Sequence, residues 1–373
     1  MELLARLVAI DSVNPDLVAG GRGESEIATF VGDWLAARGA EVRRLEATPG
    51  RPSIVGRLRG AGGGRSLLLD GHLDTVGHQG MERPLAPRID GGRLYGRGAY
   101  DMKCGVAAMM VAAANAARHG LAGDVLVAAV ADEEVASLGS AEVARALRAD
   151  AAIVTEPTAL ELVVAHKGFV WAEIETHGRA AHGSRPDLGV DAIAHMGRVI
   201  AGLEELGAEL AAGARHELLG TASVHASTVG GGEGWSTYPP SCRLRLEWRT
   251  LPGDSPSDVE RRLRALLDGL ATSDARFSAT LRLDLARPPH EIDPGHEIVR
   301  ALEGAAAAAL GRPPRLSGVA YWADCAILSA AGMPTVMFGP DGDGAHADVE
   351  WVDLASVERC ARVLEATIRS YCA

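Results

Sequence analysis

An apolar run at residues 125–131 ends in three consecutive acidic residues, Asp132, Glu133 and Glu134. Residues that commonly bind metals follow or lie within four further strand-like or glycine-rich segments: His72 with Asp74, Asp101, Glu156, and His346. In an open α/β sheet, ligands bind in the crevice outside the carboxyl ends of the strands. The pattern therefore predicts an α/β fold in which two histidines and several carboxylates converge at one edge of the sheet. Such a set of side chains would suit two metal ions.

The first 167 residues alternate between strand-like and helix-like segments. Strands are expected at 53–58, 66–71, 125–130 and 151–154, and helices over 24–38 and 106–118. Continuous apolar strands that alternate with helices are typical of a mostly parallel sheet covered on both faces. The same pattern returns from about residue 287, with a helix over 297–310, an apolar strand at 335–339 and a closing helix from about residue 354.

The segment between these two parts has a different pattern. Its strands at 169–177, 222–229, 242–248 and 279–285 and its helices at about 190–210 and from Ser255-Pro256 follow the order β-α-β-β-α-β. Alternating strands in this order indicate a ferredoxin-like α+β unit. The sequence thus predicts one domain made of residues 1–167 and 287–373, interrupted by an inserted domain at 168–286. His346 lies beyond the insertion, yet it would belong to the same site as His72.

Length and composition narrow the function classes. A chain of 373 residues favours two domains. Its net charge of −12, without a basic run, argues against nucleic-acid or anionic-membrane partners. The N-terminal segment has the pattern of an amphipathic helix and of neither a signal peptide nor a membrane span. Five scattered cysteines without a Cys-x-x-Cys pair favour reduced thiols in a cytoplasmic protein, and nothing marks Cys104, near the predicted site, as an activated nucleophile.

Each predicted ligand, taken alone, also has a structural explanation. Asp101 could cap a helix that starts near Gly105, because the helix dipole favours an anion there. The other acidic residues could cap a helix or lie in a turn, and the histidines could be core or loop residues. Their joint occurrence after strands of one sheet favours a metal site. A dinucleotide-binding glycine motif does not fit segment 96–101, because Asp101 stands where the third glycine is required.

Six motifs together resemble those of the M20 family of metallopeptidases and deacylases. They are GHLDTV, GRGAYDMKCG, DEE, EPT, HGSRPDLGVDAI and FGP…AH. The resemblance covers essentially the whole chain and is greatest to the acetylornithine deacetylase and succinyl-diaminopimelate desuccinylase group. It implies a zinc-hydrolase catalytic domain with an inserted lid domain that forms a homodimer. It also implies two Zn²⁺ ions per subunit, one held by His72, Asp101 and Glu156 and the other by Asp101, Glu134 and His346.

The resemblance assigns roles to the remaining site residues. Asp74 would support His72, and Glu133 would be the general base. A hydroxide bridging the two zinc ions would attack the amide carbonyl. Oxygen and imidazole ligands suit Zn²⁺, with Co²⁺ or Mn²⁺ as substitutes. Two adjacent ions lower the pKa of a shared water, and a carboxylate that is not a ligand, such as Glu133, can take its proton.

Two residues of the insertion complete the implied site. His182, in HGSRP, would stabilise the oxyanion in the opposite subunit, and Arg249 would bind the substrate carboxylate. The alternatives are a loop histidine and an arginine in a cross-strand ion pair. The chain departs from the family at Ser236, where relatives often have Asn, and at Lys167, where some have Arg. Lysine offers a point charge instead of a bidentate fork, which makes a succinylated substrate less favoured.

The sequence therefore predicts a cytoplasmic, homodimeric di-zinc amidohydrolase that removes the acyl group from an N-acyl amino acid. One alternative is a dipeptidase or carboxypeptidase with the same metal centre. Another is a metal-binding or regulatory protein without catalysis, although a pure binding site has no use for the extra carboxylate of Glu133. Trp235, Tyr238, Tyr321 and Trp322 could line a pocket for a flat or apolar substrate, or could serve packing. The sequence does not name the acyl group.

Overall fold

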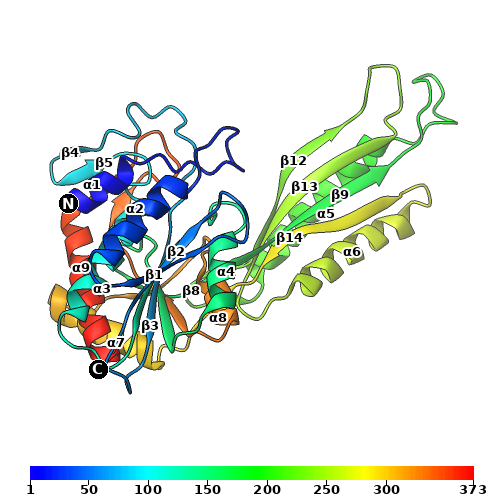
Figure 1. Ribbon diagram of the computed structural model, residues 1–373. Helices are drawn as coiled ribbons and strands as arrows, with labels where there is room; N and C mark the ends of the chain where they lie inside the picture. Colours follow the sequence, from blue (N-terminus) through cyan, green and yellow to red (C-terminus); the bar gives the residue numbers. More distant parts are fainter. The chain divides into compact units, whose positions relative to one another are not determined.

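The computed structural model describes residues 1–373, and its internal contacts divide the chain into two compact units. Unit 1 consists of residues 1–164, 292–317 and 323–373. Unit 2 consists of residues 165–291 and 318–322. Unit 2 therefore interrupts unit 1 in the sequence (Figure 1).

Unit 1 is built on a mixed sheet whose strand order is β1-β2-β6-β3-β7-β17-β8. The strands are β1 (Glu41–Leu45), β2 (Ser53–Leu58), β3 (Leu67–His72), β6 (Val125–Val130), β7 (Ala151–Val154), β8 (Leu162–His166) and β17 (Thr335–Met337). The central strands β6, β3, β7 and β17 pair in parallel, whereas β1–β2, β2–β6 and β17–β8 are antiparallel. Every residue of β3, β6 and β7 is buried, as their apolar sequences require of strands covered on both faces.

Helices cover both faces of this sheet (Figure 1). One face carries α2 (Ser25–Ala36), α3 (Lys103–Ala117) and α9 (Leu354–Tyr371), with α1 (Glu2–Val8) packed on α3 and α7 (Glu297–Leu310) on α9. The other face carries α4 (Leu138–Ala146) and α8 (Cys325–Ala330). The alanine-rich α3 lies very close to the strands, because a Cβ on Gly105 would stand only 2.0 Å from the carbonyl oxygen of Thr155. This close approach places the start of α3 beside the ends of β3 and β7.

A second, small sheet belongs to unit 1. Its order is β18 (Gly342–Asp343), β19 (Trp351–Asp353), β5 (Arg93–Tyr95) and β4 (Arg88–Asp90), all antiparallel. The connection between β18 and β19 contains His346, and the chain after β5 leads through Asp101 into α3. Short β16 (Leu316–Val319) and β15 (His290–Glu291) both pair with β8.

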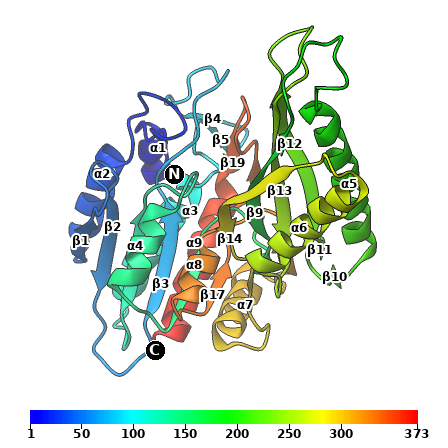
Figure 2. The same cartoon turned by 90° about the vertical axis from the view of Figure 1, so that its right-hand side faces the viewer.

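Unit 2 has the ferredoxin-like order of elements. They are β9 (Gly168–His177), α5 (Ala192–Ala212), β12 (Ser223–Gly231), β13 (Ser241–Thr250), α6 (Pro256–Ser273) and β14 (Ala279–Arg287), with a short hairpin of β10 (Arg215–His216) and β11 (Gly220–Thr221). The sheet order is β12-β13-β9-β14, entirely antiparallel, and α5 and α6 pack on one face (Figure 2). Alternate residues of β13 are buried, so Leu244, Leu246 and Trp248 form a core with Val199 and Leu263 from the helices.

The predicted α/β fold with an inserted α+β unit is confirmed. The parallel pairings are confined to the centre of the main sheet, and its outer pairings are antiparallel. The prediction missed β1, whose Glu-Val-Arg-Arg-Leu sequence is mostly exposed at the sheet edge and carries no apolar signal. No helix of the structure has both the length and the apolar character that a membrane crossing would require.

Candidate metal centre

Three of the predicted site segments follow neighbouring parallel strands. His72 is the last residue of β3, Glu133 and Glu134 follow β6, and Glu156 follows β7. Since β6, β3 and β7 are adjacent and parallel, their carboxyl ends lie at one edge of the sheet. The sheet alone therefore brings one histidine and three carboxylates together.

Two further residues reach the same place from loops of unit 1. Asp101 precedes Met102, the N-cap residue of α3. His346 lies in the β18–β19 loop with a φ of 61°, next to a tight turn at Gly344. A Cβ on Gly344 would stand 1.9 Å from the carbonyl oxygen of Val349, so only glycine fits there. The turn directs the His346 ring toward Asp101.

The carboxylate of Asp101 lies between the two histidines. Its Oδ1 is 3.2 Å from His72 Nε2, and its Oδ2 is 3.3 Å from His346 Nε2. His346 Nε2 is also 3.1 Å from Glu134 Oε2, and His72 Nε2 is 3.6 Å from Glu156 Oε1. Asp101 thus contacts one histidine with each oxygen, as a carboxylate shared between two cations would.

The donor atoms suit divalent cations. Ligand atoms of His72, Asp101 and Glu134 lie within 4.8 Å of one another, and those of His72, Glu133 and Glu156 form a second such group. One oxygen of Glu134 is buried without a hydrogen-bond partner. Buried acceptors are normally paired, so this oxygen is explained by a cation. Imidazole nitrogens and carboxylate oxygens without thiolates fit Zn²⁺, Co²⁺ or Mn²⁺.

The local electrostatics favour bound cations. The pKa of His346 is raised to about 10 because the ring contacts Asp101 and Glu134. Burial raises the pKa of Glu156 to about 8. Burial would also raise the pKa of Asp101, but its contacts with His346 and His72 outweigh that effect and lower it. His346 and Glu156, whose raised pKa values show that they bind protons tightly, would hold a divalent cation in place of those protons.

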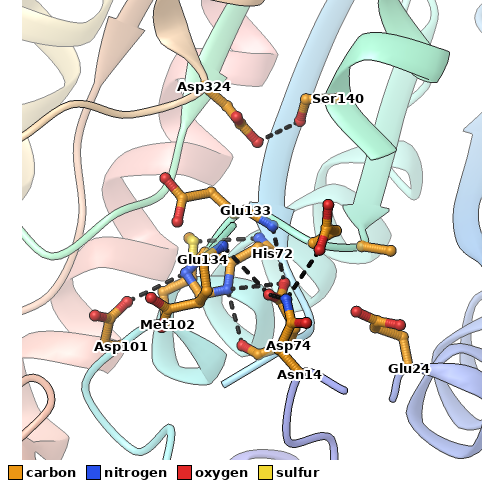
Figure 3. A network of polar contacts seen from close by, with 12 residues as sticks. Asn14, Glu24, His72, Asp74, Asp101, Met102, Glu133, Glu134, Ser140 and Asp324 are labelled. Atoms are coloured by element: carbon orange, nitrogen blue, oxygen red, sulfur yellow. Dashed lines mark hydrogen bonds and ion pairs between the residues drawn. The ribbon is translucent and has the colours of Figure 1, made fainter. Parts of the chain in front are cut away.

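Asp74 connects the ends of β3 and β6 (Figure 3). Its buried carboxylate accepts hydrogen bonds from the backbone N–H groups of Glu133 at 3.1 Å and Glu134 at 3.3 Å, and from Asn14 Nδ2 at 2.8 Å. His72 Nδ1 is 2.9 Å from the carbonyl oxygen of Asp74 and 3.6 Å from its Oδ1. A ring that donates from Nδ1 keeps the lone pair on Nε2, which faces Asp101 and Glu156 and could bind a cation.

Buried contacts of Arg51 and Asn14 hold the turn that follows β6 and begins at Asp132. Arg51 NH2 donates to Asp132 Oδ1 at 2.7 Å and to Glu24 Oε1 at 2.8 Å. Asn14 Nδ2 also reaches Asp132 Oδ1, at 3.0 Å. Asp132 itself has a φ of 70°, and its carbonyl accepts the N–H of Ser137 at 2.6 Å. A non-glycine residue in this region persists only where its surroundings hold it, which these contacts do.

Glu133 is buried among other carboxylates. Burial raises its pKa well above the usual range, and the nearby carboxylates of Glu156 and Asp324 add to this effect. Asp324 lies beside Glu133 and accepts a hydrogen bond from Ser140 at 2.5 Å (Figure 3). A carboxyl group with a raised pKa is suited to taking up and returning a proton near neutral pH. The sequence did not reveal Asp324, which comes from a segment about 190 residues away.

The remaining predicted site residues lie in unit 2. His182 is exposed, and its Nδ1 accepts the backbone N–H of Ser184 at 3.2 Å and lies 2.8 Å from the Ser184 hydroxyl. A neutral ring that accepts at Nδ1 carries its proton on Nε2, so Nε2 is a donor. Arg249 pairs side-on with Glu247, through Nε at 2.8 Å and NH2 at 3.2 Å. This partner lies two residues away on the same strand, so the ion pair of Arg249 is local and is not the cross-strand pair given as the alternative to carboxylate binding.

The structure also shows the surroundings of Lys167 and Ser236, where the chain departs from the family, and of two tryptophans and Cys104. Lys167 Nζ donates to the carbonyl oxygen of Thr221 at 2.6 Å, and the carbonyl oxygen of Ser236 accepts the N–H of Gly183 at 2.7 Å. Trp322 lies edge-on to Phe169, whereas Trp235 is fully exposed. Cys104 is buried and its thiol pKa is well above the usual range because of that burial, which gives no support to a thiolate nucleophile.

An α/β fold with a ferredoxin-like insertion, and a histidine–carboxylate cluster at the carboxyl ends of its strands, are the features of an α/β protein with a candidate metal site. The family described as Peptidase family M20/M25/M40 matches residues 68–370. Over 386 aligned residues the chain is 32% identical to the acetylornithine deacetylase of Myxococcus xanthus, covering 99% of this chain and 96% of that protein. The chain therefore belongs to the M20 family, whose members hydrolyse amide bonds.

Solved structures show the same fold. A tripeptidase from Staphylococcus aureus has a TM-score of 0.82 at 21% identity, covering all of this chain and 97% of its own. A dinuclear metal-binding M20 peptidase from Bacillus subtilis has a TM-score of 0.76 at 18% identity, with 99% and 97% covered. At these identities the likeness concerns the fold and leaves the substrate open.

Proposed function

We propose that this chain is a two-metal amidohydrolase that removes the acyl group from an N-acyl amino acid, as an acetylornithine deacetylase does. The observation that carries the proposal is the position of Asp101 between His72 and His346. The similarity to the Myxococcus xanthus enzyme over nearly the whole chain supports the substrate class.

Our proposed ligand sets follow the family resemblance. One cation would be held by His72, Asp101 and Glu156, and the other by Asp101, Glu134 and His346, with Zn²⁺ as the proposed metal. When bound, the two cations would lower the pKa of a water molecule and polarise the scissile carbonyl. Asp74 would keep the His72 ring oriented through the contacts described above.

Glu133 is the proposed general base. Glu134 contacts His346 and is the proposed ligand. The resemblance assigns to Glu133, whose carboxylate lies within 4.8 Å of the ligand atoms of His72 and Glu156, the role of accepting the proton of the attacking water. Glu133 would then return this proton to the departing amine. The raised pKa of Glu133, caused first by burial, suits both halves of this transfer.

His182 and Arg249 are the proposed substrate-facing residues of unit 2. The Nε2–H of His182 would donate to the oxyanion that forms on the carbonyl, from the opposite subunit of a homodimer. The end of the Arg249 guanidinium that Glu247 does not occupy would bind the substrate carboxylate, for which a planar fork is suited. The cytoplasm, with its reduced thiols, is the proposed location; all five cysteines are free.

The test is release of free amine by the Zn²⁺- or Co²⁺-loaded protein. The panel contains N-acetyl, N-succinyl and N-formyl amino acids together with simple dipeptides. Turnover on one acyl series supports the deacylase and identifies its acyl group. Turnover on dipeptides alone would replace the proposal with a dipeptidase, and no turnover with two metals bound would favour a binding or regulatory protein.

A further inference from the structure

The carboxylate of Glu350 is completely surrounded by donors. Its Oε2 accepts hydrogen bonds from Arg97 NH1 at 2.7 Å and from the backbone N–H of Gly98 at 3.0 Å. Its Oε1 accepts the backbone N–H groups of Tyr100 at 2.8 Å and Asp101 at 3.0 Å. The side chain is fully buried. One carboxylate therefore fixes the backbone of the whole segment that ends at the shared ligand Asp101.

Arg97 extends this arrangement to the loop that carries His346. Its side chain is 2% exposed, and all three of its nitrogens are engaged. NH1 binds Glu350, NH2 donates to the carbonyl oxygen of Ala347 at 3.0 Å, and Nε donates to that of Gly77 at 3.1 Å. Ala347 directly follows His346. The Arg97–Glu350 pair thus contacts the backbone beside both loop-borne ligands.

We propose that Glu350, held by Arg97, is a positioning residue that keeps Asp101 and His346 at the distance needed to share a cation. This inference rests on the two-metal function proposed above. Buried hydrogen bonds to a charged acceptor are short and strong. The loop of His346 needs such support because this non-glycine residue has a φ of 61°.

The effect on the two cation sites is unequal. His72 and Glu156 stand at the ends of β3 and β7, whose backbones are fixed by the sheet. Asp101 and His346 lie on loops that are joined through Glu350 and Arg97. Loss of Glu350 therefore weakens chiefly the site that contains His346, whereas the site that contains His72 keeps two ligands on strand ends.

Glu350→Gln is the most informative variant because it keeps the size of the side chain. Each oxygen of Glu350 accepts a backbone N–H, so the glutamine NH2 would face a donor in either orientation. Arg97→Lys keeps the positive charge but cannot reach Glu350, Ala347 and Gly77 together. Leu364→Ala is the control. Leu364 is a buried residue of helix α9, away from both loops, so its truncation leaves a cavity that should lower stability without changing metal binding.

The experiment is calorimetric titration of the metal-stripped full-length protein with Co²⁺, together with thermal unfolding of each variant. Wild type is expected to bind two ions. In Glu350→Gln one of the two sites should lose about 10–100-fold in affinity, with the other changed by less than about threefold. Arg97→Lys should show a smaller loss at the same site, and Leu364→Ala should bind two ions normally at a lower Tm.

Unchanged or equally reduced affinities in Glu350→Gln would overturn the inference and leave the proposed function standing. A selective loss in Leu364→Ala as well would show mere destabilisation and would also overturn it. Should Glu350→Gln not fold, Arg97→Lys decides by the same criterion. A wild-type protein that binds fewer than two ions would overturn the two-metal function itself, and this inference with it.

Discussion

The carboxylate of Asp74 accepts the backbone N–H of Glu133 at 3.1 Å, so a residue two positions after β3 holds the turn after β6. The same carboxylate accepts the N–H of Glu134 and lies near His72 Nδ1. One buried side chain therefore sets the positions of a proposed ligand, a second ligand and the proposed base.

We expect Asp74→Asn to lower metal affinity by about 10–100-fold, because in either orientation the amide NH2 would face a backbone N–H of Glu133 or Glu134 and disturb the turn that carries them. Calorimetric titration with Zn²⁺ would measure the loss. Asp90→Asn, on the exposed strand β4, is the matched control and should bind metal as wild type does. Wild-type affinity in Asp74→Asn would contradict the supporting role.

Glu133→Ala should lower kcat by about 10²–10⁴-fold while leaving bound metal nearly unchanged, because a general base contributes to catalysis without being a ligand. Steady-state kinetics and metal analysis of the same preparation would test this. Glu134→Ala provides the contrast: it removes a contact of His346 and should lose metal together with activity. Metal loss in Glu133→Ala would make Glu133 a ligand and reverse the two roles.

The sequence was informative where local pattern dictates structure. The apolar runs at β3, β6 and β7 predict buried strands, and side chains that follow parallel strands meet at one edge. Ser255 before Pro256 predicted the start of α6, where the capping box with Asp258 is present. The α/β core and the convergence of His72, Glu134 and Glu156 could therefore be expected from the sequence.

Residues that act through distant partners gave no such signal. Glu350 binds Arg97 across 253 positions, and Arg51 binds Asp132 across 81. Asp324 follows no strand-ending pattern, and Asn14 is one polar residue in a loop. Buried polar groups must find partners, but the sequence does not say which. The supporting contacts of the site emerged only from the folded chain.

Metal affinity should rise with pH between pH 6 and 8. The pKa values of about 8 for Glu156 and about 10 for His346 mean that both carry protons below pH 8 when no cation is bound. A cation must displace these protons, so the protonated form binds it less well, and affinity falls as pH falls. Titrations in buffers of different ionisation enthalpy would count the protons released. A flat profile over this range would contradict the expectation.

His182→Ala should lower kcat by about 10²–10³-fold, as expected for loss of one donor to an oxyanion. If this histidine acts in the opposite subunit, mixing His182→Ala with Glu133→Ala should restore part of the activity. A hybrid dimer would contain one site with both residues intact. Native mass spectrometry would verify subunit exchange, and verified exchange without restored activity would refute the role across subunits.

Arg249→Lys should raise KM with little change in kcat, because a carboxylate bound equally in the ground and transition states affects binding alone. Glu247 already occupies Nε and NH2, and a lysine ammonium could not hold Glu247 and a substrate carboxylate in the same planar arrangement. The loss in kcat/KM should be about 10–100-fold, the size of one hydrogen bond to a charged group.

Steady-state kinetics would be compared between an N-acyl amino acid and its carboxamide, which lacks the negative charge. The defect should largely disappear with the carboxamide, and Arg245→Lys, an exposed neighbour on β13, should show no defect with either substrate. An equal defect with both substrates would mean that Arg249 supports the sheet through Glu247 instead of binding the carboxylate.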